Sequence, residues 1–267
     1  MSRFILDLSL TDIDENIENS RGYNPYRDSD GRFASGRGGS SGGGRVGGKK
    51  LSEEDLEASM SEAGIERDYV GTRNETLTAI AAKNGFNKKP EKVSPEEFEK
   101  MSLDNLTLYR GYSPQGEDTP QKYMKEFTDG EYWAGNGNYG AGTYTFADSS
   151  KALSYADGSY DNIQAMILKK NSKIGDYATV NQEFRDFSNN MYNKYAKLSE
   201  KHYSNGNDAL GSKFDLMSDY YSFMDFGAYA AYRGYDAIKW SPKSIDDDPR
   251  TIYVVLNRGQ IIVPGEV

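Results

Sequence analysis

The chain has 267 residues, enough for one large domain or for one medium domain with appendages. It has no cysteine and a single histidine, His202, so disulfides, thiolate metal sites and histidine-rich zinc sites are excluded and no metal site is expected. The net charge of −9 argues against broad binding of nucleic acid, and because no apolar run approaches the ~20 residues that span a bilayer, neither a transmembrane segment nor a membrane partner is expected.

Residues 1–50 are predicted to form a flexible N-terminal arm and linker. Residues 31–48 are almost entirely Gly, Ser and Arg, a composition that cannot bury apolar surface. The stretch 24–36 resembles the tails and linkers of bacteriophage head-associated proteins, although a generic disordered linker would have a similar composition. Acids interrupt the short apolar patch of residues 1–7, so no signal peptide is expected.

Residues 51–104 are predicted to form a small helical segment. Ser52 with Asp55 is typical of a helix start, and Ser94 followed by Pro95 is a stronger start signal. Two or three short helices are expected, packed on the domain that follows. An apolar stripe is available for this packing, formed by Leu77, Ile80 and Ala81.

From residue 105 the pattern changes to short strands around helices, and residues 105–267 are expected to form one domain. Helical spacing predicts helices over 182–204 and from about 208 to 233. Strands are predicted over residues 106–110, 143–146, 163–168, 235–240, 251–256 and 260–263. Strands clustered around helices indicate an α+β fold with a split, mostly antiparallel sheet and flanking helices, preceded by the helical segment and the disordered arm.

The most informative segment runs from Tyr139 to Tyr155 and follows an isolated Leu-Tyr-Arg-Gly that ends at Arg110 and Gly111. Two glycines lead directly into an alternating strand, which breaks at an acid and enters a helix with another tyrosine. Glycine lets the backbone approach a ligand closely, tyrosine gives a rigid face for stacking, and the planar fork of arginine grips phosphate. These parts suit a ligand that joins a flat ring to a diphosphate.

This segment resembles the nicotinamide-binding strand and helix of the ADP-ribosyltransferase superfamily, most closely of its diphtheria-toxin and poly-ADP-ribose-polymerase branch. That branch has the pattern G-x-G-x-Y-F-A-D-x-x-S-K-S-x-x-Y. The spacing here departs by one residue, because Thr145 separates Tyr144 from Phe146. The likeness covers about residues 105–265. The matching positions are Gly140, Gly142, Tyr144, Ala147, Asp148, Ser150, Lys151 and Tyr155.

The resemblance implies that NAD is bound as a substrate. Arg110 matches the arginine-type branch, in which an arginine at this place contacts the cofactor, whereas Tyr144 matches the polymerase-like branch. The implied contacts are Arg110, Gly111, Gly142, Thr143, Tyr144 and Tyr155. Each has a structural alternative: a strand-end salt bridge for the arginine, ordinary turns for the glycines, and packing for the tyrosines. Asp148 is expected to cap a helix.

The carboxylate of the reaction is the missing part of the motif. ADP-ribosyl transfer passes through a sugar cation, which a carboxylate usually stabilises. In the family a glutamate at the start of a late strand supplies it, where this chain has Thr251 or Ile252. Three substitutes are open: Asp236, the acidic loop 246–248 and the uncharged Asn257. Asp236 is preferred, so the predicted catalytic residues are Asp236 and Arg110.

The resulting hypothesis is a mono-ADP-ribosyltransferase that transfers ADP-ribose from NAD to a host protein, carried behind a flexible arm. The arm suggests association with bacteriophage particle proteins and a location in the host cytoplasm or the virion. Two alternatives stay open. One is a non-catalytic head-associated or inhibitor protein with this fold, favoured by the missing glutamate. The other is an NAD glycohydrolase, which hydrolyses NAD without transfer.

Overall fold

The structure is a computed structural model that describes residues 48–64, 73–113, 119–242 and 250–265. Every element given below lies within the unit formed by residues 45–267. The arm predicted for residues 1–50 lies almost wholly outside the described residues.

A mixed sheet of eight strands organises the described residues, in the spatial order β1-β8-β4-β2-β3-β7-β6-β5. Its two edge pairs, β1 with β8 and β5 with β6, are parallel, and the five pairs between them are antiparallel. The strands are β1 (Glu91–Val93), β2 (Leu106–Gly111), β3 (Thr143–Phe146), β4 (Ile163–Leu168), β5 (Ile174–Asp176), β6 (Ala237–Trp240), β7 (Ile252–Val255) and β8 (Ile261–Pro264).

The sheet is split between β2 and β3. β2 pairs with β4 along six positions, from Leu106 to Gly111. Its register with β3, in contrast, is the single pair Tyr109 with Phe146. Beyond that pair β2 and β3 diverge, so Arg110 and Gly111 lie at the opening between the two halves of the sheet. The predicted α+β fold with a split, mostly antiparallel sheet is therefore confirmed.

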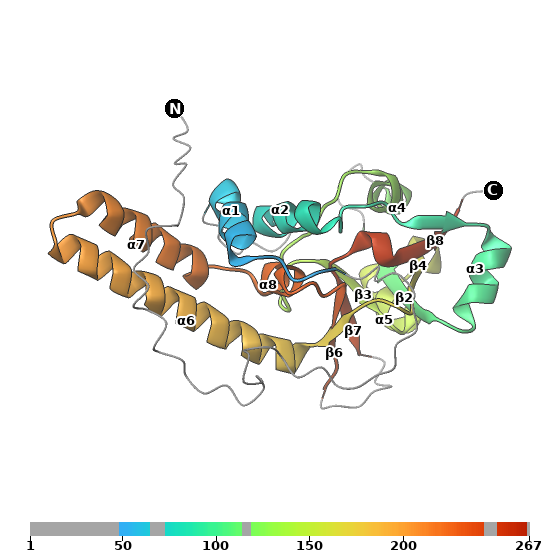
Figure 1. Cartoon of the computed structure of the whole chain (residues 1–267). Helices are drawn as coiled ribbons and strands as arrows, with labels where there is room; N and C mark the ends of the chain where they lie inside the picture. Colours follow the sequence, from blue (N-terminus) through green and yellow to red (C-terminus); the bar gives the residue numbers. More distant parts are fainter. Residues whose placement is uncertain (1–47, 65–72, 114–118, 243–249, 266–267) are drawn as a thin grey trace, which may run out of the picture. The chain divides into compact units, whose positions relative to one another are not determined.

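Eight α-helices accompany the sheet within the described residues, and α6 and α7 form an antiparallel hairpin (Figure 1). Ser52 and Ser94 start helices as expected, and Thr119 starts another; each side chain accepts an amide N–H at the first turn. The helices are α1 (Glu53–Ala63), α2 (Glu75–Asn84), α3 (Pro95–Ser102), α4 (Pro120–Asp129), α5 (Ser149–Ala152), α6 (Tyr177–Ser204), α7 (Asp208–Ser222) and α8 (Phe226–Tyr232), with short 3₁₀ turns η3 (Leu153–Tyr155), η4 (Tyr160–Asn162) and η6 (Arg258–Gln260).

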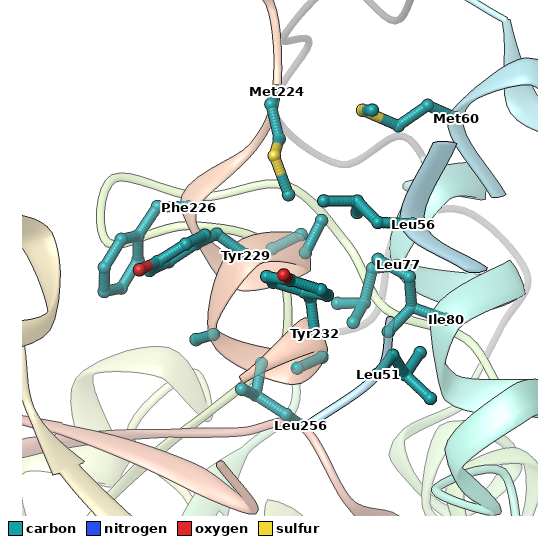
Figure 2. Packing of buried hydrophobic residues seen from close by; sticks show 14 of the residues in the cluster. Leu51, Leu56, Met60, Leu77, Ile80, Met224, Phe226, Tyr229, Tyr232 and Leu256 are labelled. Atoms are coloured by element: carbon teal, nitrogen blue, oxygen red, sulfur yellow. The ribbon is translucent and has the colours of Figure 1, made fainter. Parts of the chain in front are cut away.

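Alternating strand residues send their side chains into two separate cores, one on each face of the sheet. On one face, Val254 and Ile238 join the helices α1, α2, α6, α7 and α8 in the larger cluster. Figure 2 shows the centre of this cluster, where Tyr229 and Tyr232 of α8 meet Leu56 of α1 and Leu77 of α2. On the opposite face the smaller cluster includes Leu108, Val255 and Phe127, the last from α4.

The structure departs from the predicted elements at four places. The helical stretch from 208 to 233 breaks into α7 and α8, because the Asp225 side chain accepts the amide N–H of Ala228 and starts a new helix. α4 was not predicted, although Thr119 followed by Pro120 gives the same start signal as Ser94 followed by Pro95. The three-residue strands β1 and β5 were not predicted either.

No helix among the described residues combines the length and the apolar character needed to cross a membrane. In the same part of the chain, no group of three or more His, Cys, Asp and Glu side chains is arranged to hold a metal ion.

Candidate ligand-binding pocket

A cavity of about 710 Å³ lies at the opening between the two halves of the sheet. Ligand pockets of small molecules typically have volumes of ~300–1,000 Å³. The floor comes from the ends of β2, β3 and β7, and the wall comes from α4 and the loop that follows it. The lining residues are Arg73, Arg110, Gly111, Tyr112, Ser113, Tyr123, Glu126, Phe127, Gly130, Glu131, Tyr132, Trp133, Thr143, Val255 and Arg258. This cavity is called the Arg110 pocket below.

Arg110 is held in the pocket by aromatic rings. It lies two residues after the buried Leu108 on β2, so it projects from the same face of the sheet. Its guanidinium carbon lies 4.9 Å from the centre of the Tyr112 ring and 5.6 Å from that of Phe127. No ion pair joins Arg110 to a residue that the structure describes. The strand-end salt bridge considered from the sequence is thus absent from this part of the chain, and the cation faces the cavity.

Aromatic side chains form the wall beside Arg110. Tyr112 and Tyr123 stack at 6.3 Å between ring centres with planes 11° apart. The Tyr112 hydroxyl donates a hydrogen bond to Oε1 of Gln164 at 2.7 Å, and burial raises the pKa of Tyr112 above its usual value. Tyr112 is therefore a fixed and neutral ring under the Arg110 guanidinium.

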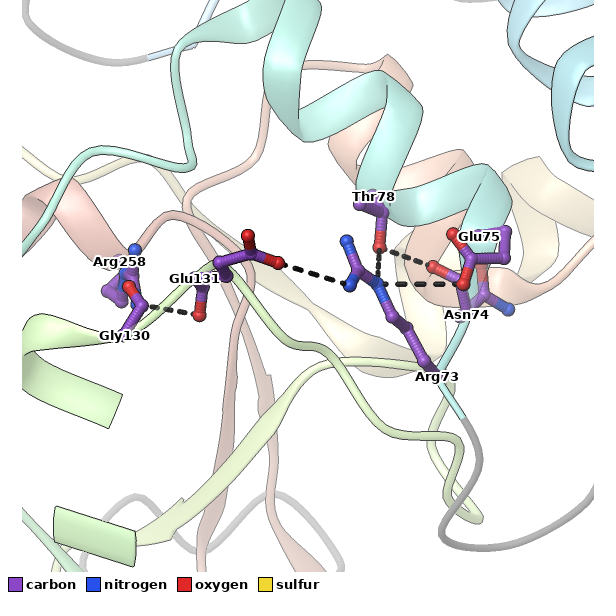
Figure 3. A network of polar contacts seen from close by, with 7 residues as sticks. All are labelled: Arg73, Asn74, Glu75, Thr78, Gly130, Glu131 and Arg258. Atoms are coloured by element: carbon purple, nitrogen blue, oxygen red, sulfur yellow. Dashed lines mark hydrogen bonds and ion pairs between the residues drawn. The ribbon is translucent and has the colours of Figure 1, made fainter. Parts of the chain in front are cut away.

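Arg258 also lines the pocket, but it is buried, with 4% of its surface exposed. Its guanidinium donates hydrogen bonds of 3.0–3.3 Å to backbone carbonyls of two separate segments, the loop after α2 and the end of α4. Figure 3 shows Arg258 beside Gly130 and Glu131 of the second segment. The acceptors are the carbonyl oxygens of Asn87, Lys88, Phe127, Gly130 and Glu131. Burial lowers the pKa of Arg258. Because these carbonyls occupy its donors, Arg258 is a structural residue of the pocket.

Arg73 lies at the mouth of the pocket with weak ionic partners. Its Nε is 3.6 Å from Oε1 of Glu75, and its Nη1 is 3.9 Å from Oε2 of Glu131 (Figure 3). Nε also donates to Oγ1 of Thr78 at 3.3 Å. The Glu131 side chain is 93% exposed, and exposed pairs of this kind contribute ~0–1 kcal/mol. Arg73 can therefore exchange Glu131 for an anionic ligand at small cost.

Gly111 and Thr143, two of the predicted contacts, do line the pocket. Gly111 also has a packing role, because a Cβ at this position would lie 2.2 Å from the carbonyl oxygen of Ala152 in α5. Thr143 pairs with Val255 across β3 and β7, and both side chains lie on the face that carries Leu108.

Gly142 is explained by packing and does not line the pocket. Its φ is +152°, and a Cβ there would lie 2.4 Å from Cγ1 of Val254. Any side chain would collide with β7, so glycine is required here by the sheet. The prediction that Gly142 contacts the cofactor is not supported by this placement.

Tyr144 and Tyr155 lie on the face of the sheet opposite Arg110, which corrects the prediction that they join it in one cleft. Tyr144 alternates with Thr143 on β3, so it projects into the larger core. Its hydroxyl donates to the Gly140 carbonyl at 2.8 Å and accepts the Tyr139 amide N–H at 2.7 Å. Burial raises its pKa. Tyr144 closes the glycine turn before β3.

Tyr155 shares that opposite face. It ends η3, is 57% exposed, and stacks on Phe146 at 5.2 Å between ring centres. Phe146 is two residues after Tyr144, so the two tyrosines do flank one surface of β3. Neither side chain lines the Arg110 pocket, because the sheet lies between them and Arg110.

Asp236, predicted to be the catalytic carboxylate, is buried and does not line the Arg110 pocket. The residue is 0% exposed. Oδ2 accepts the Lys173 amide N–H at 2.7 Å, and Oδ1 accepts Nδ2–H of Asn257 at 2.6 Å and the Gly48 amide N–H at 3.4 Å. Burial raises the pKa of Asp236, while these hydrogen bonds act in the opposite direction. The Asp236 carboxylate thus connects two backbone amides and the Asn257 side chain.

Among the described residues, Asn257 and the position of the family glutamate do not supply a carboxylate to the pocket either. Asn257 holds Asp236 through Nδ2 and accepts the Gly259 amide N–H through Oδ1. Ile252 packs against the larger core, and the Thr251 hydroxyl lies 3.0 Å from that of Ser241. The loop 246–248 lies outside the described residues. Asp148 accepts the Ser150 amide N–H at 2.7 Å, which confirms it as a helix cap.

Sequence reasoning missed the wall of the pocket. Arg73, Tyr123, Glu126, Glu131 and Trp133 were not singled out, and most of them belong to α4 or its following loop. The start signal at Thr119 could have revealed the helix. No local pattern shows that this helix covers the end of β2, because that contact joins distant parts of the chain.

A comparison with models of known protein families, with curated proteins and with solved structures found no match for this chain.

Proposed function

We propose that the chain binds NAD in the Arg110 pocket and transfers its ADP-ribose to a protein acceptor. The observation that carries the proposal is the placement of Arg110: a guanidinium without an ion pair to the described residues, held over Tyr112 at the split in the sheet. The motif that resembles the ADP-ribosyltransferases follows on β3, which borders the same pocket through Thr143.

The pocket suits the diphosphate of NAD. Arginine binds phosphate oxygens with two parallel N–H groups, and Arg110 has donors available for this. Arg73 lines the same cavity and can release Glu131 at small cost. A ligand with two phosphates matches two guanidiniums at one opening.

The proposed reaction breaks the bond between the nicotinamide nitrogen and C1′ of the ribose. The bonding electron pair leaves with nicotinamide, which becomes neutral. A nucleophilic atom of the acceptor then forms a bond to C1′ and gives its proton to a base. Positive charge develops on the sugar during this exchange, so a nearby carboxylate lowers the barrier.

Two glutamates among the described lining residues are placed to supply that carboxylate. Glu126 belongs to α4 and Glu131 to the loop after it, and both border the cavity that contains Arg110. They replace Asp236 in the proposal, because Asp236 is buried by backbone contacts. The variants Glu126→Gln and Glu131→Gln separate them: the one that slows transfer by ~10²-fold while retaining NAD binding identifies the carboxylate.

The second candidate is a non-catalytic binding protein with the same fold. A specific observation favours it: the position where the family has a glutamate holds Thr251 or Ile252, and neither supplies a charge, because the Thr251 hydroxyl contacts that of Ser241 and the Ile252 side chain packs against the larger core. A chain that kept the pocket without the chemistry would bind NAD and leave it intact.

NAD with separate labels on the nicotinamide and the adenylate decides among these functions. The purified chain is incubated with this NAD and a bacterial lysate. Release of nicotinamide with the adenylate label on a lysate protein supports the transferase. Release without protein labelling indicates NAD hydrolysis. Neither event, with NAD recovered intact, contradicts the proposed reaction and leaves the binding protein. A host protein as acceptor and an association with bacteriophage particles rest on the resemblance of residues 24–36.

A further inference from the structure

Trp133 is an exposed aromatic side chain inside the Arg110 pocket. It is 47% exposed, although it stands between two buried neighbours, Tyr132 at 9% and Ala134 at 1%. It shares the pocket lining with Arg73 and Arg110. A single exposed aromatic residue needs no explanation by itself. One placed beside two guanidiniums in a cavity of ligand size is a candidate binding group.

The backbone on both sides of Trp133 is fixed. The Tyr132 hydroxyl donates to the Leu256 carbonyl at 2.7 Å. The Asn74 amide donates to the Ala134 carbonyl, and the Gly142 amide donates to the Gly135 carbonyl, both at 2.9 Å. The segment is thereby connected to the regions before α2 and before β3. The Trp133 side chain therefore projects from a rigid support.

Gly135 lets the indole lie against the backbone. A Cβ at Gly135 would lie 2.8 Å from Cη2 and 2.9 Å from Cζ3 of Trp133. Any larger residue at this position would displace the six-membered ring. Packing on Gly135 limits the rotation of the indole and leaves about half of its surface accessible. A preorganised ring loses little side-chain freedom when a ligand stacks on it.

We propose that Trp133 is the stacking residue for a planar ring of the ligand, so that the pocket selects molecules that join an aromatic ring to a phosphate. Stacking on Trp133 provides affinity for the ring, and Arg110 and Arg73 provide affinity for the anion. The inference rests on the proposed function for the location of the site. It does not depend on whether ADP-ribose is transferred.

Tryptophan fluorescence tests this directly, because the chain has two tryptophans, Trp133 and Trp240. Trp240 stacks on Tyr139 at 4.7 Å between ring centres and is absent from the pocket lining. In the variant Trp240→Phe, emission comes from Trp133 alone, and NAD should quench it in a saturable way. In Trp133→Phe, emission comes from Trp240 alone, and the quenching should be lost.

Affinity gives the second readout. Trp133→Leu removes the π face, so the Kd of NAD measured by calorimetry should rise about tenfold, which corresponds to about 1.4 kcal/mol. Trp133→Phe retains a ring and should weaken binding less. Circular dichroism confirms that both variants fold. Equal Kd values for the native chain and Trp133→Leu, or quenching that persists in Trp133→Phe, would overturn the proposal.

The choice of probe identifies the ring. ADP-ribose carries adenine without nicotinamide, nicotinamide mononucleotide carries nicotinamide without adenine, and inorganic pyrophosphate carries neither. Quenching of Trp133 by one or both nucleotides and not by pyrophosphate supports the proposal and names the ring. Quenching by pyrophosphate equal to that by NAD contradicts it. If NAD quenches Trp133 but is not turned over, this inference holds and the proposed transferase activity fails. If NAD is turned over without quenching Trp133, the transferase activity holds and this inference fails.

Discussion

Asn257 donates Nδ2–H to Oδ1 of Asp236 at 2.6 Å, in the interior at the end of β7. The other carboxylate oxygen accepts the amide of Lys173, just before β5, at 2.7 Å. The Asp236 side chain, just before β6, thus connects the backbone before β5 with the Asn257 side chain that follows β7. A residue that looks catalytic in the sequence, an acid before a strand in a candidate domain, here stabilises the sheet.

Replacement of Asp236 by asparagine is expected to destabilise the fold. The amide has one oxygen where the carboxyl group has two, so at least one N–H donor from Lys173, Asn257 or Gly48 loses its acceptor. An unpaired buried group costs about 1–3 kcal/mol. Urea unfolding of Asp236→Asn measures this loss, with the exposed Asp161→Asn as the control. Unchanged stability would mean that the buried contacts of Asp236 contribute nothing.

Tyr144→Phe tests the correction to the tyrosine motif. The variant keeps the ring and loses the hydroxyl that joins the Gly140 carbonyl to the Tyr139 amide. Stability should therefore fall by about 1 kcal/mol, and the Kd for NAD should not change, because Tyr144 lies across the sheet from Arg110. The two quantities are measured by urea unfolding and calorimetry. Weaker NAD binding with unchanged stability would restore Tyr144 as a ligand contact.

Arg258→Lys should be strongly destabilising although it conserves the charge. A lysine ammonium has three donors on a single atom and cannot reach carbonyls of both segments that the guanidinium joins. Loss of two or more hydrogen bonds to a charged group predicts a cost of about 3 kcal/mol or more. The midpoint of urea unfolding measures it, with the exposed Arg185→Lys as a matched control. A variant as stable as the control would show that the carbonyl contacts are dispensable.

The ion pair between Lys92 of β1 and Asp129 at the end of α4 predicts a pH dependence. The Lys92 ammonium lies 2.8 Å from Oδ1 of Asp129, and its hydrogen bond is the main cause that lowers the pKa of Asp129 below 3.8. An acid with a lowered pKa stabilises the fold above its unfolded pKa, and this contribution is lost as the pH falls through the folded value.

Asp129→Asn should accordingly lower the free energy of unfolding slightly at pH 7, and the difference from the native chain should vanish as the pH falls below 3.8. Added salt should reduce the difference at pH 7, because the pair is exposed. Urea unfolding at several pH values measures both effects. A difference that grows toward acid pH would contradict the assignment.

Much of the fold could be predicted from local patterns. β3 and β4 have the predicted bounds, and Ser52 and Ser94 start helices as expected, because capping and alternation are short-range properties. Which of the candidate residues share a face of the sheet could not be predicted in the same way. Whether Tyr144 and Arg110 share a face depends on the register of β2 and β3, which are more than thirty residues apart in the sequence.

The residues that form the wall of the pocket could not be predicted from local patterns either. Arg110 was expected at the end of a strand, and β2 ends at the next residue, Gly111. Arg110 also lines the cavity. Trp133 and Glu126 reach that cavity because Arg258 holds the end of α4 to the loop after α2. Such a long-range contact has no signature in any one segment. Of the contacts predicted from the sequence, Arg110, Gly111 and Thr143 line the pocket, whereas Gly142, Tyr144 and Tyr155 do not.

The most direct test of the account is the affinity of NAD for the native chain and for Arg110→Lys, measured by calorimetry together with urea unfolding. Lysine keeps the charge and loses the two-pronged grip on phosphate. The Kd is expected to rise about tenfold or more, about 1.4 kcal/mol, while the free energy of unfolding stays near that of the Arg185→Lys control. No binding of NAD to the native chain, or equal affinity in both, would contradict a cofactor site at Arg110.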